Sequence, residues 1–432
     1  MRDVSLWRCL LGLEDTVIEG VELDRDERVL VVAVRPMARR RGRCGRCRAP
    51  AAGYDAGRGR RRWRALDSAT VRVYLEADSP RVRCRAHGVV VAHVPWARHR
   101  ARATHAFEDQ VAWLVTKTSL STVAELMRVS WRTVSGILTR VWNQIAARVD
   151  LLDGLTRIGI DEVSWRRHQR YLLAVVNHDT GRLVWVGKGN TTATVQSFFD
   201  ALGPHRCAQI THISADAAPY IAKSTAKNCP QAVRVADPFH VVKWANDALG
   251  EVRLEVWRET RRIARANSRG RGRAPADVQE EFPAYQRLRI LTRSRYALWK
   301  NPENLTTHQQ ARLDWIAKTD PRLWRAYQLK EGLRAVLRLP AAEARIAIDA
   351  WCRSARRCRI AQFVDLARMV AEQRGPILAA IEHGLSNAIS ESVNTRIRLR
   401  NRIAFGIKDP DALISLLMLT LSGHTPALPG RT

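Results

Sequence analysis

Cysteine and long apolar runs are both scarce in this sequence. Eight cysteines are spread over 432 residues, which is too few for a disulfide-stapled secreted scaffold. The first twenty residues carry acids where a signal peptide needs an uninterrupted apolar stretch, and no run approaches the ~18 apolar residues of a membrane-spanning helix. These absences argue against secreted and membrane proteins, and they predict a cytoplasmic protein.

Acidic residues and lysine are also under-represented. Asp and Glu number 42 against 72 Lys and Arg, which gives a net charge of +30 and a pI of about 11.1. Only nine of the 72 basic residues are lysine, which leaves 63 arginines. Such an excess is typical of nucleic-acid-binding proteins, and the planar arginine fork suits phosphate and guanine. GC-rich coding would produce the same arginine bias without a function, and this alternative stays open.

Two short cysteine and histidine pairs stand in the N-terminal part, each after a strand-like run at 28–35 or 70–77. Tetrahedral zinc needs two ligand pairs that a hairpin scaffold brings together. The sequence therefore predicts a structural zinc site formed by Cys44, Cys47, Cys84 and His87.

The alternative is that Cys84 is a buried thiol and His87 a surface histidine. Further candidate ligands are Cys9, His93 and His99.

From about Thr104 to residue 150 the apolar residues recur at helical spacing. Ser130 is a plausible N-cap of the last helix. Two helices joined by a short turn indicate a helix-turn-helix, although an ordinary helical hairpin shows the same pattern. In the first interpretation, the start of the recognition helix would reach base edges in the major groove. The residues at that end are Trp131, Arg132 and Thr133.

After residue 155 the pattern changes to that of strands. Strands are expected at 157–165, 170–179, 182–189, 209–216 and 232–238, with helices at 194–202, 217–228 and about 239–265. The first three strands form an antiparallel meander, because a turn signal stands at 178–181. A meander followed by alternating helices and strands is the element order of a ribonuclease H-like sheet.

Asp161 and Asp216 each end an apolar strand. A carboxylate there is unfavourable unless it is paired or binds a cation. The two strands would be neighbours, and Glu391, on a C-terminal helix, would supply a third carboxylate. Asp237 competes for the same role. Strand alternation turns Glu162 to the opposite face.

Oxygen ligands of this kind suit Mg²⁺ or Mn²⁺. Two such ions would activate the attacking oxygen and stabilise the leaving oxygen of a phosphodiester displacement. His240 would orient a phosphate or a metal-bound water, or it is a buried histidine at a helix start. For each acid, a salt bridge to one of the many arginines is the alternative.

Taken together, these motifs resemble those of the DDE transposases of the ISL-three insertion-sequence family over nearly the whole chain. The matching segments are the two cysteine and histidine pairs, the helix-turn-helix, 160–162, 214–216 with Tyr220, 237–243, 327–331 and 386–396. The chain has His87 where family members often have cysteine, a change that zinc tolerates.

The resemblance implies an α/β multidomain protein with an RNase H-like catalytic core interrupted by a helical insertion. Asp161, Asp216 and Glu391 would be the DDE triad that holds two Mg²⁺ or Mn²⁺ ions. The protein would bind double-stranded DNA at the terminal inverted repeats of its element, cut it, and join the end to target DNA. It would act as a homo-oligomer on DNA and associate with the nucleoid.

The expected domains follow from this resemblance. They are a β-rich zinc-ribbon-like module at 1–95, a helix-turn-helix at 96–150, the first part of the core at 151–245, a helical insertion at 246–375, the closing helices at 376–425 and a tail at 426–432. Within the insertion, residues 268–275 predict an exposed break. Two other functions stay open: a non-catalytic DNA-binding regulator or inactivated transposase, and a structure-specific two-metal nuclease.

Overall fold

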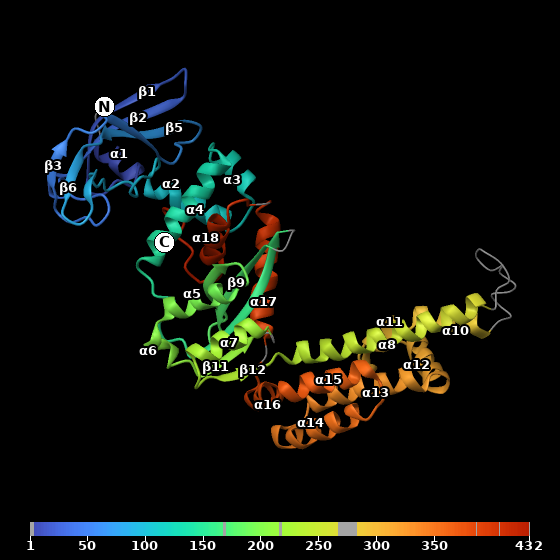
Figure 1. The fold of residues 1–432 in the computed structure, drawn as a ribbon. Coiled ribbons are helices and arrows are strands. Elements are labelled where there is room, and N and C mark those ends of the chain that lie inside the picture. Colours follow the sequence, from blue (N-terminus) through green and yellow to red (C-terminus); the bar gives the residue numbers. More distant parts are fainter. Residues whose placement is uncertain are drawn as a thin grey trace.

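The structure is a computed structural model that describes residues 4–166, 170–215, 218–266, 283–385, 387–405 and 407–431. A β-rich N-terminal module leads into a unit of three helices, which lies against a central sheet. A long helical arm extends from the opposite end of that sheet (Figure 1). In the described part of the chain, no helix is both long and apolar enough to cross a bilayer.

The N-terminal module contains two sheets. The first has the strand order β1-β2-β5-β4, and the second has the order β3-β6-β7. Its buried centre includes Trp63, whose ring meets that of Trp96 edge-on at 5.5 Å. The elements are α1 (Val4–Leu10), β1 (Thr16–Asp24), β2 (Val29–Pro36), η1 (Ala38–Arg40), β3 (Ala52–Asp55), β4 (Arg60–Arg64), β5 (Arg72–Asp78), β6 (Arg81–Cys84) and β7 (Gly88–Val91).

Three helices follow: α2 (His105–Val115), α3 (Leu120–Leu126) and α4 (Trp131–Ala146). Each begins with a hydroxyl that accepts a hydrogen bond from the backbone N–H three residues later. Such caps satisfy donors that the first turn of a helix leaves open. The predicted N-cap Ser130 is confirmed, and Thr104 and Ser119 cap the other two helices.

The central sheet has the order β10-β9-β8-β11-β12. The predicted antiparallel meander of β8, β9 and β10 is confirmed, and β11 and β12 continue it in parallel with β8. Sequence reasoning missed the short helix α6. The elements are β8 (Arg157–Arg166), β9 (Arg170–Asn177), β10 (Arg182–Lys188), α5 (Thr192–Leu202), α6 (Pro204–Cys207), β11 (His212–Ala215), α7 (Pro219–Asn228) and β12 (Val233–Val235).

Strand alternation divides β8 between two cores. Ile158 and Ile160 face the core that α5 and α7 cover. Val163 and Trp165 face the other core, which they share with α2 and α4 and with two C-terminal helices, α17 (Ala388–Ile403) and α18 (Pro410–Leu421). The three-helix unit and the central sheet are therefore packed around one common core.

The helical arm leaves the sheet directly after β12 and returns to it. Its return is fixed where the backbone N–H of Ala236 donates to the carbonyl of Pro376 at 3.0 Å. Trp351 belongs to the buried core of the arm. The predicted break at 268–275 lies outside the described residues. The elements are α8 (Pro238–Ala266), α10 (Pro283–Arg293), α11 (Arg295–Trp299), η2 (Pro302–Asn304), α12 (Thr307–Thr319), α13 (Pro321–Val336), α14 (Ala341–Arg356), α15 (Ala361–Glu372) and α16 (Arg374–His383).

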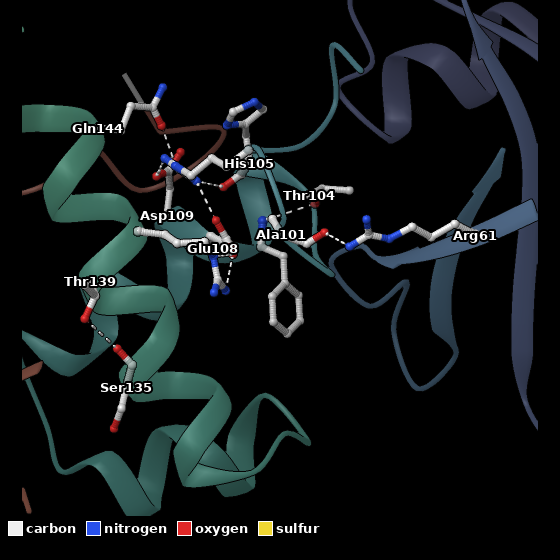
Figure 2. A network of polar contacts seen from close by, with 12 residues as sticks. Arg61, Ala101, Thr104, His105, Glu108, Asp109, Ser135, Thr139 and Gln144 are labelled. Carbon is white, nitrogen blue, oxygen red and sulfur yellow. Dashed lines mark hydrogen bonds and ion pairs between the residues drawn. The ribbon is translucent and has the colours of Figure 1, made fainter. Parts of the chain in front are cut away.

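A buried ionic network joins the N-terminal module to the three helices (Figure 2). Glu108 on α2 is fully buried, and it accepts hydrogen bonds from Arg140 of α4 at 2.6 and 2.8 Å. Arg98, which precedes the helices, contacts Glu108 at 3.2 Å and Asp109 at 2.5 Å, and it also donates to Gln144. The network therefore fixes α4 relative to the segment that enters from the N-terminal module.

We expect Glu108→Ala to destabilise this unit by about 3–5 kcal/mol, because it leaves two arginines without their buried partner. Glu125→Ala is the matched control, since Glu125 is exposed on α3 and surface changes usually stay within about 0.5 kcal/mol. Denaturant unfolding followed by circular dichroism measures both. Equal midpoints for the two variants would show that the network does not stabilise the junction.

Candidate functional site

Asp161 is a buried carboxylate, 8% exposed, on β8. Its Oδ2 accepts hydrogen bonds from the Asn394 amide at 2.6 Å and the Asn387 amide at 3.5 Å. Its Oδ1 accepts the backbone N–H of Glu162 at 2.7 Å. Because hydrogen bonds to a carboxylate stabilise its charged form, these donors offset part of the cost of burial.

Helix α17 presents one polar face to β8. Asn387, Glu391 and Asn394 are spaced by four and three residues, so they lie along the same side of the helix. The helix comes very close to the strand at Gly159, where an added Cβ would lie 2.3 Å from the Ser390 Oγ. The missing side chain at Gly159 thus allows α17 to pack closely against the strand that carries Asp161.

Glu391 is grouped with two further predicted residues. Ligand atoms of Asp237, His240 and Glu391 all lie within 4.8 Å of one another. Asp237 is 4% exposed, and its carboxylate pairs with the His240 Nδ1 at 2.8 Å and with the backbone N–H of Phe239 at 3.1 Å. Two carboxylates and an imidazole in this space are a donor set suited to a divalent cation.

The remaining predicted acid, Asp216, lies outside the described residues. The strand before it is described: β11 runs parallel to β8, with Ala215 opposite Ile160. The prediction that these two strands are neighbours in the sheet is therefore confirmed. Glu162 points to the opposite face as predicted, where it accepts hydrogen bonds from Asn190 at 3.0 Å and from Tyr220.

A buried polar chain behind Asp161 was not predicted. His178 Nε2 and Ser214 Oγ are 2.7 Å apart, and Ser214 donates to the Asn387 Oδ1 at 3.0 Å. Burial lowers the pKa of His178 below its usual value, which favours the neutral ring. This chain holds the amide of Asn387 in the orientation that directs its Nδ2 toward Asp161.

A second site, in the N-terminal module, consists of the four predicted zinc ligands. Cys44 Sγ lies 3.7 Å from His87 Nδ1, Cys84 Sγ lies 3.6 Å from that nitrogen, and the sulfurs of Cys47 and Cys84 are 3.7 Å apart. Zn–S bonds of about 2.3 Å in a tetrahedron imply separations of about 3.7 Å. The four side chains therefore fit one zinc ion.

The surroundings of Cys44 favour a metal-binding thiolate. Burial by itself would raise the pKa of Cys44, but hydrogen bonds from the backbone N–H groups of Cys47 and Arg46 lower it to about 6. The further candidate ligands are not part of the cluster that the described residues form. Cys9 is exposed, and burial lowers the pKa of His93 to about 4.

The start of α4 faces outward. Trp131 is 49% exposed, and Arg132 and Thr133 are also exposed. The Arg132 guanidinium lies 5.5 Å from the centre of the Trp131 ring. An exposed helix start with an aromatic, a cationic and a hydroxyl side chain is able to contact base edges and phosphates.

Three family models match successive parts of the chain. Residues 40–87 match the zinc-finger of the transposases IS204, IS1001, IS1096 and IS1165. Residues 92–142 match the helix-turn-helix domain of transposase family ISL3. Residues 158–417 match the ISL3 transposase model. These matches cover the cysteine and histidine cluster, the three helices, and the central sheet with its arm.

Curated proteins align over the full length. The transposase for insertion sequence element IS1557 of Mycobacterium tuberculosis is 53% identical, and the alignment includes 100% of this chain and 98% of the relative. The transposase for insertion sequence element IS1001 of Bordetella parapertussis is 26% identical, with 98% of this chain and 100% of the relative aligned. Since the transposase model spans more than half of the residues and a relative over 50% identical aligns end to end, the chain belongs to the ISL3 family of transposases.

Proposed function

We propose that this chain is a metal-dependent DNA transposase whose catalytic acids are Asp161, Asp216 and Glu391. The observation that carries the proposal is the polar face of α17. On this face, the amides of Asn387 and Asn394 donate hydrogen bonds to Asp161, and Glu391 lies between them in sequence. In this proposal the central sheet is an RNase H-like core, and the arm from α8 to α15 is an insertion within it.

The three acids would hold two Mg²⁺ or Mn²⁺ ions, with Asp237 and His240 beside Glu391. Such ions, when bound, supply activation of the attacking oxygen and neutralisation of the leaving oxygen. The protein residues orient the carboxylates. Asn387 and Asn394 fix the rotation of the Asp161 carboxylate, and Asp237 holds the imidazole of His240 by its Nδ1.

The N-terminal half would recognise the terminal inverted repeats of the element. In this proposal the zinc ion stabilises the fold of the N-terminal module, and Trp131, Arg132 and Thr133 read bases in the major groove. The cut end would then be joined to target DNA. Because two ends must be brought together, the protein would act as a homo-oligomer on DNA.

Cleavage of the DNA that flanks its own gene tests this function. With Mg²⁺ or Mn²⁺ we expect a nick at a flanking repeat, and Asp161→Asn and Glu391→Gln should each abolish the nick while DNA affinity persists. Glu162→Gln is the matched control, since Glu162 faces away from the site. Tight, specific binding by the wild type without cleavage would favour a regulator or an inactive transposase. Cleavage at positions that do not depend on the repeat sequence would favour a structure-specific nuclease.

Asn394→Ala should raise the Mg²⁺ concentration needed for half-maximal cleavage by about 10- to 100-fold, the usual effect of losing a residue that orients a metal ligand. Asn401→Ala is matched to it, because Asn401 also joins α17 to β8 through the carbonyl of Trp165 without touching Asp161. A metal titration of cleavage separates the two. Equal shifts in both variants would mean that Asn394 only supports the helix.

Cys44→Ser should lose the bound zinc and weaken recognition of the repeat, because structural zinc contributes to the folding of small modules. Cys9→Ser provides the comparison, since Cys9 lies outside the cluster. Elemental analysis of the purified proteins measures about one zinc per chain for wild type and Cys9→Ser. Undiminished zinc in Cys44→Ser would disprove the zinc site.

A further inference from the structure

A cavity of about 1000 Å³ lies in the N-terminal module. Its walls come from the turn between β3 and β4, from β4 itself, from the beginning of β6, and from the segment that leads into α2. Seven arginines line it, and none of the described residues that line it is acidic. We refer to it as the arginine cavity.

Neighbouring carboxylates neutralise only part of this charge. Glu76 pairs with Arg60 at 3.3 Å and with Arg62 at 2.9 Å. Asp55 pairs with Arg81, whose Nε donates at 2.9 Å. These two acids are associated with three of the seven arginines.

Four guanidinium groups remain: those of Arg58, Arg61, Arg100 and Arg102. Within the described part of the chain none of the four forms an ion pair, and Arg61 instead donates to the carbonyl of Ala101 at 2.5 Å (Figure 2). Burial, followed by the charge of Arg102, lowers the pKa of Arg61 below its usual value. An anion in the cavity would relieve this repulsion.

The β3–β4 turn has a backbone conformation that requires glycine at two positions. Gly57 and Gly59 both have positive φ, +71° and +81°, which side chains rarely tolerate. An added Cβ on Gly57 would lie 2.2 Å from the carbonyl oxygen of Ser79. Gly57 therefore allows the turn to lie tightly against Ser79, just before β6, and Arg58 stands between the two glycines at the cavity wall.

The cavity is rigidly connected to the helix-turn-helix. The backbone N–H of Arg64 on β4 donates to the carbonyl of Arg102 at 2.9 Å, and that of Thr104, the N-cap of α2, donates to the carbonyl of Arg64 at 2.8 Å. Arg98, a few residues earlier, contacts Glu108 of α2 and Gln144 of α4. The cavity wall therefore shares backbone hydrogen bonds with the start of α2, and the segment that contributes Arg100 and Arg102 is also joined to the C-terminal part of α4.

We propose that the arginine cavity binds the phosphodiester backbone of the same DNA duplex whose bases α4 reads. This proposal rests on the proposed function above. Arginine binds phosphate oxygens through paired donors. The volume and the four unneutralised guanidinium groups suit successive phosphates rather than one small anion. Contacts of this kind set the register of a protein on DNA but carry no sequence information.

The test is the salt dependence of DNA binding by the full chain, measured by fluorescence anisotropy without Mg²⁺ or Mn²⁺. The slope of log K against log salt is negative, and each lost phosphate contact makes it less steep by about 0.9. We expect Arg58→Gln with Arg102→Gln to reduce the steepness by about 1.8 and to weaken binding equally for the flanking repeat and for unrelated DNA. The double variant Arg58→Lys with Arg102→Lys should keep most of the slope, because it keeps the charge.

The control is Arg25→Gln with Arg28→Gln, an equal change of charge in the exposed turn between β1 and β2. Its slope should match that of the wild type, and all variants should contain wild-type zinc. An unchanged slope in the Arg58 and Arg102 glutamine variant would overturn the proposal while leaving the transposase intact. Loss of preference for the repeat would also overturn it, since it indicates base contacts. A wild type that binds no DNA would overturn both proposals.

Discussion

The burial of one carboxylate governs much of this structure. Asp161 follows the apolar residues Ile158 and Ile160 on β8, and it depends on amides from residues more than two hundred positions later, at the start of α17 and within it. An unpaired charge at this depth would cost several kcal/mol. Helix α17 therefore has to dock with its polar face toward β8, and this docking brings Glu391 to the cluster with Asp237 and His240.

Local patterns in the sequence were sufficient for some of these features. Strand alternation correctly placed Glu162 on the face opposite Asp161, and the spacing of Cys44 and Cys47 led to the cluster with Cys84 and His87. The resemblance to the ISL3 transposases is confirmed. The triad stays a proposal, because Asp216 is outside the described residues.

Other features leave no local pattern. The contacts of Asn387 and Asn394 with Asp161, and the chain from His178 through Ser214, join residues far apart in sequence whose pairing depends on the finished fold. Likewise, the sequence revealed an excess of arginine but not where it gathers. The arginine cavity exists because β4 lies beside the segment that enters α2, and composition carries no information on that neighbourhood.

The last helix, α18, packs against α4 and β10 in the core that the helix-turn-helix shares with the central sheet. This arrangement has a consequence for synthesis on the ribosome. A nascent chain that has reached the end of the helical arm still lacks α17 and α18, so it contains neither Glu391 nor the apolar side chains that cover α4. Such a chain would expose part of this core and would lack the Glu391 member of the cluster with Asp237 and His240. The order of the elements thus delays completion of the shared core and of this side-chain cluster until α17 and α18 have been synthesised.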